Sequence, residues 1–185
     1  MLKSQDTLIL LKIQSIRSLP TDSLRDDAWQ NPEFLLKYSV LGTSVGMSTS
    51  QGFSAVQRLI QAGLLNKELT VRKRLAAEWL IHGLKYFQPP RYGGLTRGIP
   101  TSYAAVPLRG MISQSELGQE PPPVWEYADG VRGIAFEPIY KTVPLAAGRD
   151  PKLYEYLVLL DAIRSGRTRE AALAIDLLRQ KLGEP

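Results

Sequence analysis

The strongest restriction on the fold comes from residues 38–65, YSVLGTSVGMSTSQGFSAVQRLIQAGLL, which hold two helical segments in a very short stretch. The first segment ends at Gly46, a residue type that readily adopts the left-handed conformation that closes a helix. The second begins at Ser48, where STSQ predicts a capping box between Ser48 and Gln51. Such a pair of helices is either a surface held against DNA or a compact hairpin inside an unrelated core.

The second helix of this pair has two chemically different sides. Small and apolar residues recur at helical spacing on one side, which predicts close packing against another helix: Gly52, Ala55, Val56, Leu59 and Gly63. The other side carries hydroxyl and amide groups around one aromatic ring: Thr49, Ser50, Phe53, Ser54, Gln57 and Gln61. The sequence therefore predicts a helix that buries one side and presents a hydrogen-bonding side.

Helices are also predicted along most of the remaining chain. Apolar periodicity and helix-end signals predict them over 7–18, 33–45, 72–87 and 151–165, with a last helix capped by Thr168. Asp6 is the expected cap of the first, Gly166 the expected stop of the fourth, and Phe87 is expected to point inward at the end of the third.

One β-hairpin is expected. PVWEYADGVRGIAFEPIY (123–140) has two β-prone runs around Asp129-Gly130, a dipeptide favoured in tight turns between antiparallel strands. The Pro- and Gly-rich residues 88–108 predict a long loop instead, as do 18–34 and 112–123. The predicted fold class is mainly α with a small β-hairpin.

Composition narrows the class of protein. The 185 residues are 44% hydrophobic and 22% charged, as in ordinary globular proteins, and no apolar run approaches a membrane-spanning length. With no cysteine, disulfides and cysteine metal sites are excluded, and a cytoplasmic location is expected. His82 is the one histidine and no carboxylate pair is spaced for a metal, so we expect no metal, no organic cofactor and no enzymatic activity.

Positive charge is concentrated in the middle of the chain. Residues 48–115 hold nine basic and two acidic side chains, whereas 1–47 are balanced and 116–185 hold nine basic and eleven acidic ones. A segregated excess of this kind favours a polyanionic partner. GGLTRGIPTS (93–102) has a composition able to cradle phosphate, but it lacks a P-loop ending. Tyr86, Tyr92 and Tyr103 would either stack on single-stranded bases or pack on the core.

The stretch 38–65 resembles the helix-turn-helix of MarR-type winged-helix regulators. In those proteins a helix ending in a small residue precedes a Ser/Thr-capped recognition helix that closes on Ala-Gly-Leu and a hydrophobic residue. Ser48 matches the cap, Val56 and Leu59 match the buried positions, and Ala62-Gly63-Leu64-Leu65 matches the ending. The resemblance covers residues 5–75 and implies a DNA-binding domain over 1–75, with an abbreviated wing because 66–74 is too short for two strands. Residues 76–185 then form a C-terminal α+β extension.

The resemblance implies a set of DNA-binding residues. Thr49, Ser50, Ser54 and Gln57, following the Ser48 cap, would face the major groove, with Phe53 against a thymine methyl group and Arg58 on a backbone phosphate. Arg72, Lys73 and Arg74 would lie where a wing contacts the flanking backbone. The implied function is a transcriptional regulator that binds double-stranded DNA as a homodimer.

The later segments AAEWLIHGLKYF, GGLTRGIPTSYAA and EPIYKTVP…DPKLYEYLVLLDAIRSG resemble a group of bacterial helix-turn-helix proteins. Some relatives of that type act as antitoxins or regulators beside nucleotidyltransferase-like toxins. The alternative function is therefore an antitoxin-like protein whose C-terminal half binds a partner enzyme, with or without repression of its own promoter.

Overall fold

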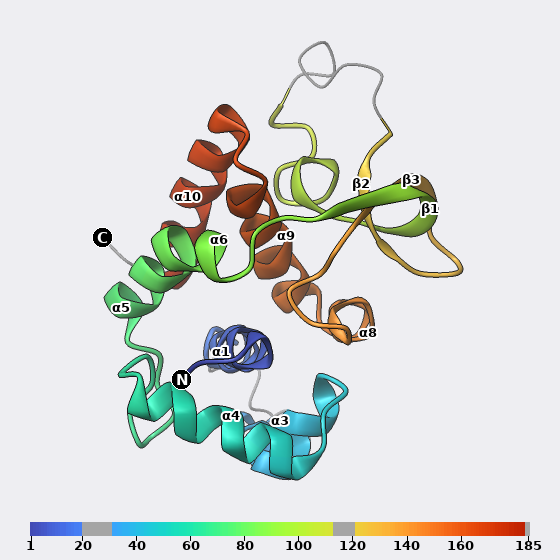
Figure 1. Cartoon of the computed structure of the whole chain (residues 1–185). Coiled ribbons are helices and arrows are strands. Elements are labelled where there is room, and N and C mark those ends of the chain that lie inside the picture. The colour runs from blue at the N-terminus through green and yellow to red at the C-terminus, as the bar shows by residue number, and fades with distance from the viewer. Residues whose placement is uncertain (20–30, 113–120, 184–185) are drawn as a thin grey trace.

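The computed structural model describes residues 1–19, 31–112 and 121–183. The chain is mainly helical with a small three-stranded sheet and a helical C-terminal part, which confirms this level of the fold prediction (Figure 1). The parts of the predicted loops over 20–30 and 113–120 lie outside the described residues. The helices are α1 (Ser4–Arg17), α2 (Pro32–Leu35), α3 (Tyr38–Ser44), α4 (Thr49–Gln61), α5 (Lys73–Glu78), α6 (Leu84–Phe87), α8 (Val143–Arg149), α9 (Pro151–Ser165) and α10 (Thr168–Leu182); the strands are β1 (Tyr92–Pro100), β2 (Pro123–Glu126) and β3 (Val131–Phe136).

Helix α1 lies between the two halves of the molecule. It packs against α3 and α4 on one side and against α9 on the other (Figure 1). Its apolar residues are therefore buried around its whole circumference, including Leu8, Leu10 and Ile13. The prediction that Asp6 caps this helix is wrong in detail, because α1 already begins at Ser4 and the Asp6 carboxylate reaches back to the Lys3 amide at 2.8 Å.

The helix predicted over 33–45 is two helices, α2 and α3, with a break at Leu36–Lys37. The two predicted helix-end signals that follow, Gly46 and the Ser48–Gln51 capping box, are confirmed. Gly46 has a φ of +72°, and the Gln51 amide donates to Ser48 Oγ at 3.2 Å while Gln51 Oε1 accepts from the Ser48 amide at 3.0 Å. Helices α3 and α4 are thus joined by only four residues.

The helix predicted over 72–87 runs from Lys73 to Phe87, but its middle turn, Trp79–Gly83, is π-helical. The Trp79 ring lies over Gly83, where a Cβ would be only 2.6 Å from it. The prediction that Phe87 points inward is wrong, since its side chain is 40% exposed. The wider turn shifts the face that the last residues present.

The predicted hairpin is wrong, and so is the loop predicted over 88–108. Residues 92–100 form β1, which pairs antiparallel with both β2 and β3. Strands β2 and β3, on either side of Asp129-Gly130, are therefore parallel to each other, with Pro123 opposite Ile134. The turn at 127–130 carries the chain across β1 and does not fold it back. A side chain on Gly98 would overlap the Trp125 carbonyl, so the Gly-rich composition permits this close pairing.

The C-terminal helices form as predicted from Asp150 onward, and α8 was not predicted. Asp150 caps α9 by accepting from the Leu153 amide at 3.0 Å, and Gly166 ends it with a φ of +74°. Arg167, not Thr168, is the N-cap of α10. Buried apolar residues from α1 through α10 form one continuous cluster, so the segments 1–75 and 76–185 share a core. No helix in the described ranges is long and apolar enough to cross a membrane.

Candidate nucleic-acid interface

The apolar side of α4 attaches it to the body of the molecule. Ala55, Val56 and Leu59 are fully buried against α1 and α3, as the spacing predicts. Gly52 lies where α4 crosses α3, and a Cβ there would be 3.2 Å from the Gly42 Cα atom. The two backbones therefore approach closely, and the position of α4 is fixed by packing along its whole inner side.

A buried ion pair holds the same helix from its flank. Arg58 donates from Nε and Nη2 to the two carboxylate oxygens of Asp6, at 2.8 and 2.6 Å. Asp6 is 1% exposed, and its carboxylate also accepts a hydrogen bond from the Lys3 amide. The hydrogen bonds that Arg58 donates to Asp6 raise the pKa of Arg58 further above its already high value.

This pairing corrects the predicted role of Arg58. The guanidinium faces α1, and two of its nitrogens contact Asp6. Arg58 therefore links α4 to α1 and is not directed at a phosphate. Arg58 is the only cation within α4. The helix therefore presents a neutral polar surface, and the positive charge that a polyanion requires has to come from neighbouring segments.

The outer side of α4 faces solvent. Ser48, Thr49, Ser50 and Gln57 are exposed and Ser54 is partly exposed. The Ser48 hydroxyl is occupied by the capping box, whereas the side chains of the other four make no hydrogen bond to any described residue. In Figure 1, α4 lies at one end of the molecule.

Phe53 occupies the middle of this outer side. It is 46% exposed, and its ring meets the edge of Tyr38 from α3 at 5.1 Å between centroids. Tyr38 covers part of the Phe53 ring and leaves nearly half of the residue's surface accessible. The aromatic group is therefore available for a contact outside the chain.

The three basic residues after α4 are all exposed, but they are not equivalent. Arg72 is the N-cap of α5, and Arg74 lies in its first turn. Lys73 instead lies at the C-terminal end of α10, with Nζ 2.8 Å from the position of a Cβ on Gly183. The loop before them is a short antiparallel contact, Leu65 with Val71, which Arg17 ties to α1 by donating to the Glu68 carbonyl at 2.7 Å.

Helix α8 contacts the turn between α3 and α4, which sequence reasoning missed. Thr142 Oγ1 donates to the Val45 carbonyl at 2.6 Å, and the side chains of Thr142 and Leu145 fill the space beside Gly46. Arg149 donates to the Thr43 carbonyl at 3.4 Å. The sequence TVPLAAGRDP offers a helix signal in its proline at the first turn, but nothing in it indicates contact with a turn 100 residues earlier.

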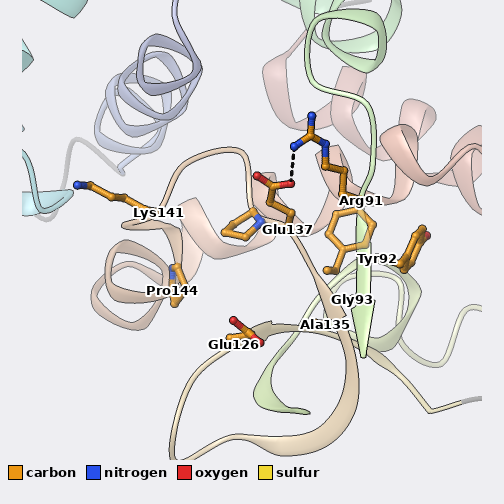
Figure 2. Close-up of a pocket in the computed structure, with 10 residues that line it drawn as sticks. Arg91, Tyr92, Gly93, Glu126, Ala135, Glu137, Lys141 and Pro144 are labelled. Carbon is orange, nitrogen blue, oxygen red and sulfur yellow. Dashed lines mark ion pairs between the residues drawn. The ribbon is translucent and has the colours of Figure 1, made fainter. Parts of the chain in front are cut away.

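A cavity of about 510 Å³ lies between the sheet and α8 (Figure 2). Its walls include Tyr92, Ala135 and Pro144, and an exposed ion pair between Arg91 and Glu137, at 3.7 Å, stands at its rim.

The phosphate cradle considered from the sequence over 93–102 is not formed. Most of these residues lie in β1, where their backbone groups pair with the neighbouring strands. Tyr86 and Tyr92 are exposed but Tyr103 is buried, so these three rings do not share one stacking surface.

Two further features bear on chemistry. His82 is exposed on the π-helical turn. Within the described ranges no three His, Cys, Asp or Glu side chains come together to hold a metal.

Comparison of the chain with models of protein families, with curated proteins and with solved structures finds no match. The resemblance to MarR-type regulators therefore stays a prediction from the residues quoted above. The geometry of α3, α4 and their surroundings has to support any function on its own.

Proposed function

We propose that this protein is a transcriptional regulator that binds duplex DNA with α4. The proposal rests on the different roles of the two sides of α4. Its apolar side and its one cation are used to fix it on α1, while its hydroxyl and amide groups face solvent without partners among the described residues. A rigidly held helix with an unpaired polar side fits the major groove, which admits an α-helix and displays donors and acceptors on every base pair.

The exposed residues of the predicted set then have distinct physical roles. Thr49, Ser50, Ser54 and Gln57 supply hydrogen bonds to base edges, and Phe53 supplies an apolar contact to a thymine methyl group. The amides at the capped end of α4 are oriented toward a backbone phosphate. Arg72 and Arg74 neutralise phosphates beyond the other end, which adds affinity that depends on salt.

The protein acts as a homodimer in this proposal. A single α4 reaches only a few base pairs, and two-fold proteins that bind two half-sites one helical turn apart gain both affinity and length of recognised sequence. A palindromic site recovered by selection would be the signature of this arrangement.

The test begins with selection of bound sequences from a pool of random duplexes, followed by fluorescence anisotropy on the enriched site and on a scrambled one. The Ser54→Ala, Gln57→Ala double variant should bind the enriched site roughly tenfold more weakly, because lost base contacts remove about 1–3 kcal/mol of discrimination. Its affinity for the scrambled duplex should change little. Gln180→Ala, an exposed amide on α10, is the matched control and should bind like the wild type.

Failure has a clear form. If no sequence is enriched and the wild type binds no duplex at low salt, the proposal is wrong. If the wild type binds but the α4 variant discriminates as well as the wild type does, another surface reads the sequence.

A second function, binding of a partner protein by the C-terminal part, is favoured by a different observation. Exposed apolar side chains occur on β1, β3 and the turn before β3, namely Tyr92, Leu95, Tyr127 and Val131. Large apolar groups left in solvent are a feature of interaction sites. Co-expression with the product of the neighbouring gene tests it: a complex that survives high salt and is lost in Leu95→Ser, Val131→Ser would establish the antitoxin-like function. The same complex formed by that variant would exclude the sheet as its site.

A further inference from the structure

We propose that α8 and the residue pair Lys141 and Arg149 form a second part of the DNA-binding surface, holding backbone phosphate beside the N-terminal end of α4. This inference rests on the proposed function and extends it to residues far away in the sequence. It follows from where α8 is attached, which charges it carries and which charges α4 lacks.

The attachment of α8 is direct. Thr142 donates to the Val45 carbonyl at 2.6 Å, and Leu145 packs beside Gly46 in the turn that leads into α4. Arg149, at the other end of α8, reaches the Thr43 carbonyl at the end of α3. Helix α8 therefore spans the turn, and both of its flanking cations lie near the end of α4 at which a recognition helix enters a groove.

The two cations are available. Lys141 and Arg149 are exposed, and neither forms an ion pair with a carboxylate in the described residues. In Figure 2 the Lys141 side chain points away from the Arg91–Glu137 pair at the rim of the cavity. The hydrogen bond from Arg149 to Thr43 is long, at 3.4 Å, so it orients the guanidinium at little cost to a stronger phosphate contact.

Helix α4 itself supplies no cation for contact with a backbone phosphate. Its own Arg58 is engaged with Asp6, and residues 34–67 contain no Asp or Glu that would repel a phosphate. Arg72 and Arg74 follow the C-terminal end of α4, so they serve only that side. Thirteen helical residues span about 20 Å, and the major groove is about 12 Å wide, so cations beyond both ends of α4 meet the phosphates on both sides of the groove.

The experiment measures binding of the enriched duplex and of a scrambled duplex at several salt concentrations. Lys141→Ala, Arg149→Ala should weaken binding to both duplexes by a similar factor, about tenfold at 0.1 M salt, and should lower the slope of log K against log salt by about 2. Preference for the enriched site should persist, because phosphate contacts carry no direct sequence information. The charge-conserving variant Lys141→Arg, Arg149→Lys should restore most of the affinity and the slope.

The matched control removes two cations elsewhere. Arg97 and Arg132 are exposed cross-strand neighbours on β1 and β3, so Arg97→Ala, Arg132→Ala has the same net charge as the test variant. Its salt slope should equal that of the wild type. An unchanged slope for the α8 variant, or an equal fall in the control, overturns the inference while leaving DNA binding by α4 intact; absence of binding by the wild type overturns both.

Discussion

At the scale of single residues, the pair Asp6–Arg58 shows what a local sequence pattern does not predict. The sequence predicts Asp6 as a helix cap and Arg58 as a phosphate contact, and the structure instead pairs the two side chains with each other. Their pairing over 52 positions depends on how α1 and α4 pack, which no local pattern reports. The exposed residues Thr49, Ser50 and Gln57 were predictable because helical periodicity alone decides which side they occupy.

The Asp6–Arg58 pair gives a stability prediction. Arg58→Ala leaves the buried Asp6 carboxylate without its charged partner and should lower the free energy of unfolding by about 3–5 kcal/mol. Gln57→Ala, one residue earlier and exposed, should change it by less than about 0.5 kcal/mol. Urea unfolding followed by tryptophan fluorescence measures both.

The double variant Asp6→Ala, Arg58→Ala is the informative control. Once the carboxylate is gone, the alanine at 58 no longer strands a charge, so the double variant should lose much less than the sum of the two single losses. Additive losses would mean that the two side chains contribute independently and that the pair does not fasten α4 to α1.

At the scale of elements, two helical glycines differ in what surrounds them. A Cβ on Gly42 of α3 would be 2.8 Å from the Ser48 carbonyl oxygen, whereas a Cβ on Gly148 of α8 would meet nothing within 4 Å. The first glycine permits α3 to approach the start of α4, and the second has no packing role. The sequence alone does not separate them.

The two glycines should therefore respond oppositely to alanine. Gly42→Ala should destabilise the protein by about 1–3 kcal/mol through overpacking against a backbone that cannot move easily. Gly148→Ala should stabilise it by roughly 0.5–1 kcal/mol because alanine favours a helix interior. Thermal unfolding of both variants measures these changes in stability. Destabilisation by Gly148→Ala would show that α8 does not tolerate the added methyl group.

The helices were more predictable than the sheet for a physical reason. Caps and apolar periodicity act over four to seven residues, so Ser48–Gln51 and Asp150 indicate helix starts directly. Strand β1 contains three glycines and one proline, a composition typical of loops, and its partners lie 24 or more residues away. Asp129-Gly130 does form a turn, but the direction of β3 is decided by β1, which was not recognised as a strand.

At the scale of the whole molecule, Asp150 connects the two halves of the chain. Its carboxylate accepts from Lys12 and Ser15 of α1, each at 2.8 Å, and caps α9 through the Leu153 amide. Burial opposes its ionisation, but these contacts outweigh burial and lower the pKa of Asp150 below its usual value. Asp150 therefore links α1, on which α4 packs, to α9 in the C-terminal core.

A pKa lowered on folding makes this contribution dependent on pH. The stability that the charged carboxylate provides is complete above the unfolded value of about 3.9 and is lost as the pH falls through the lower folded value. Asp150→Asn, which retains a capping oxygen, should cost about 2 kcal/mol at pH 7 through loss of charged hydrogen bonds. Urea unfolding at pH 7, 5, 4 and 3 should show this difference constant down to about pH 5 and smaller below pH 4; a difference that grows on acidification would contradict the assignment.

The central position of α1 bears on how the protein is made. A ribosome releases α1 about 140 residues before α9, the helix that covers one side of it. Until then Leu10, Ile13 and their neighbours lack part of their cover, and the nascent N-terminal part, including α4, has no complete support. We therefore expect α4 to reach its final position only after α9 has been synthesised and has packed on α1.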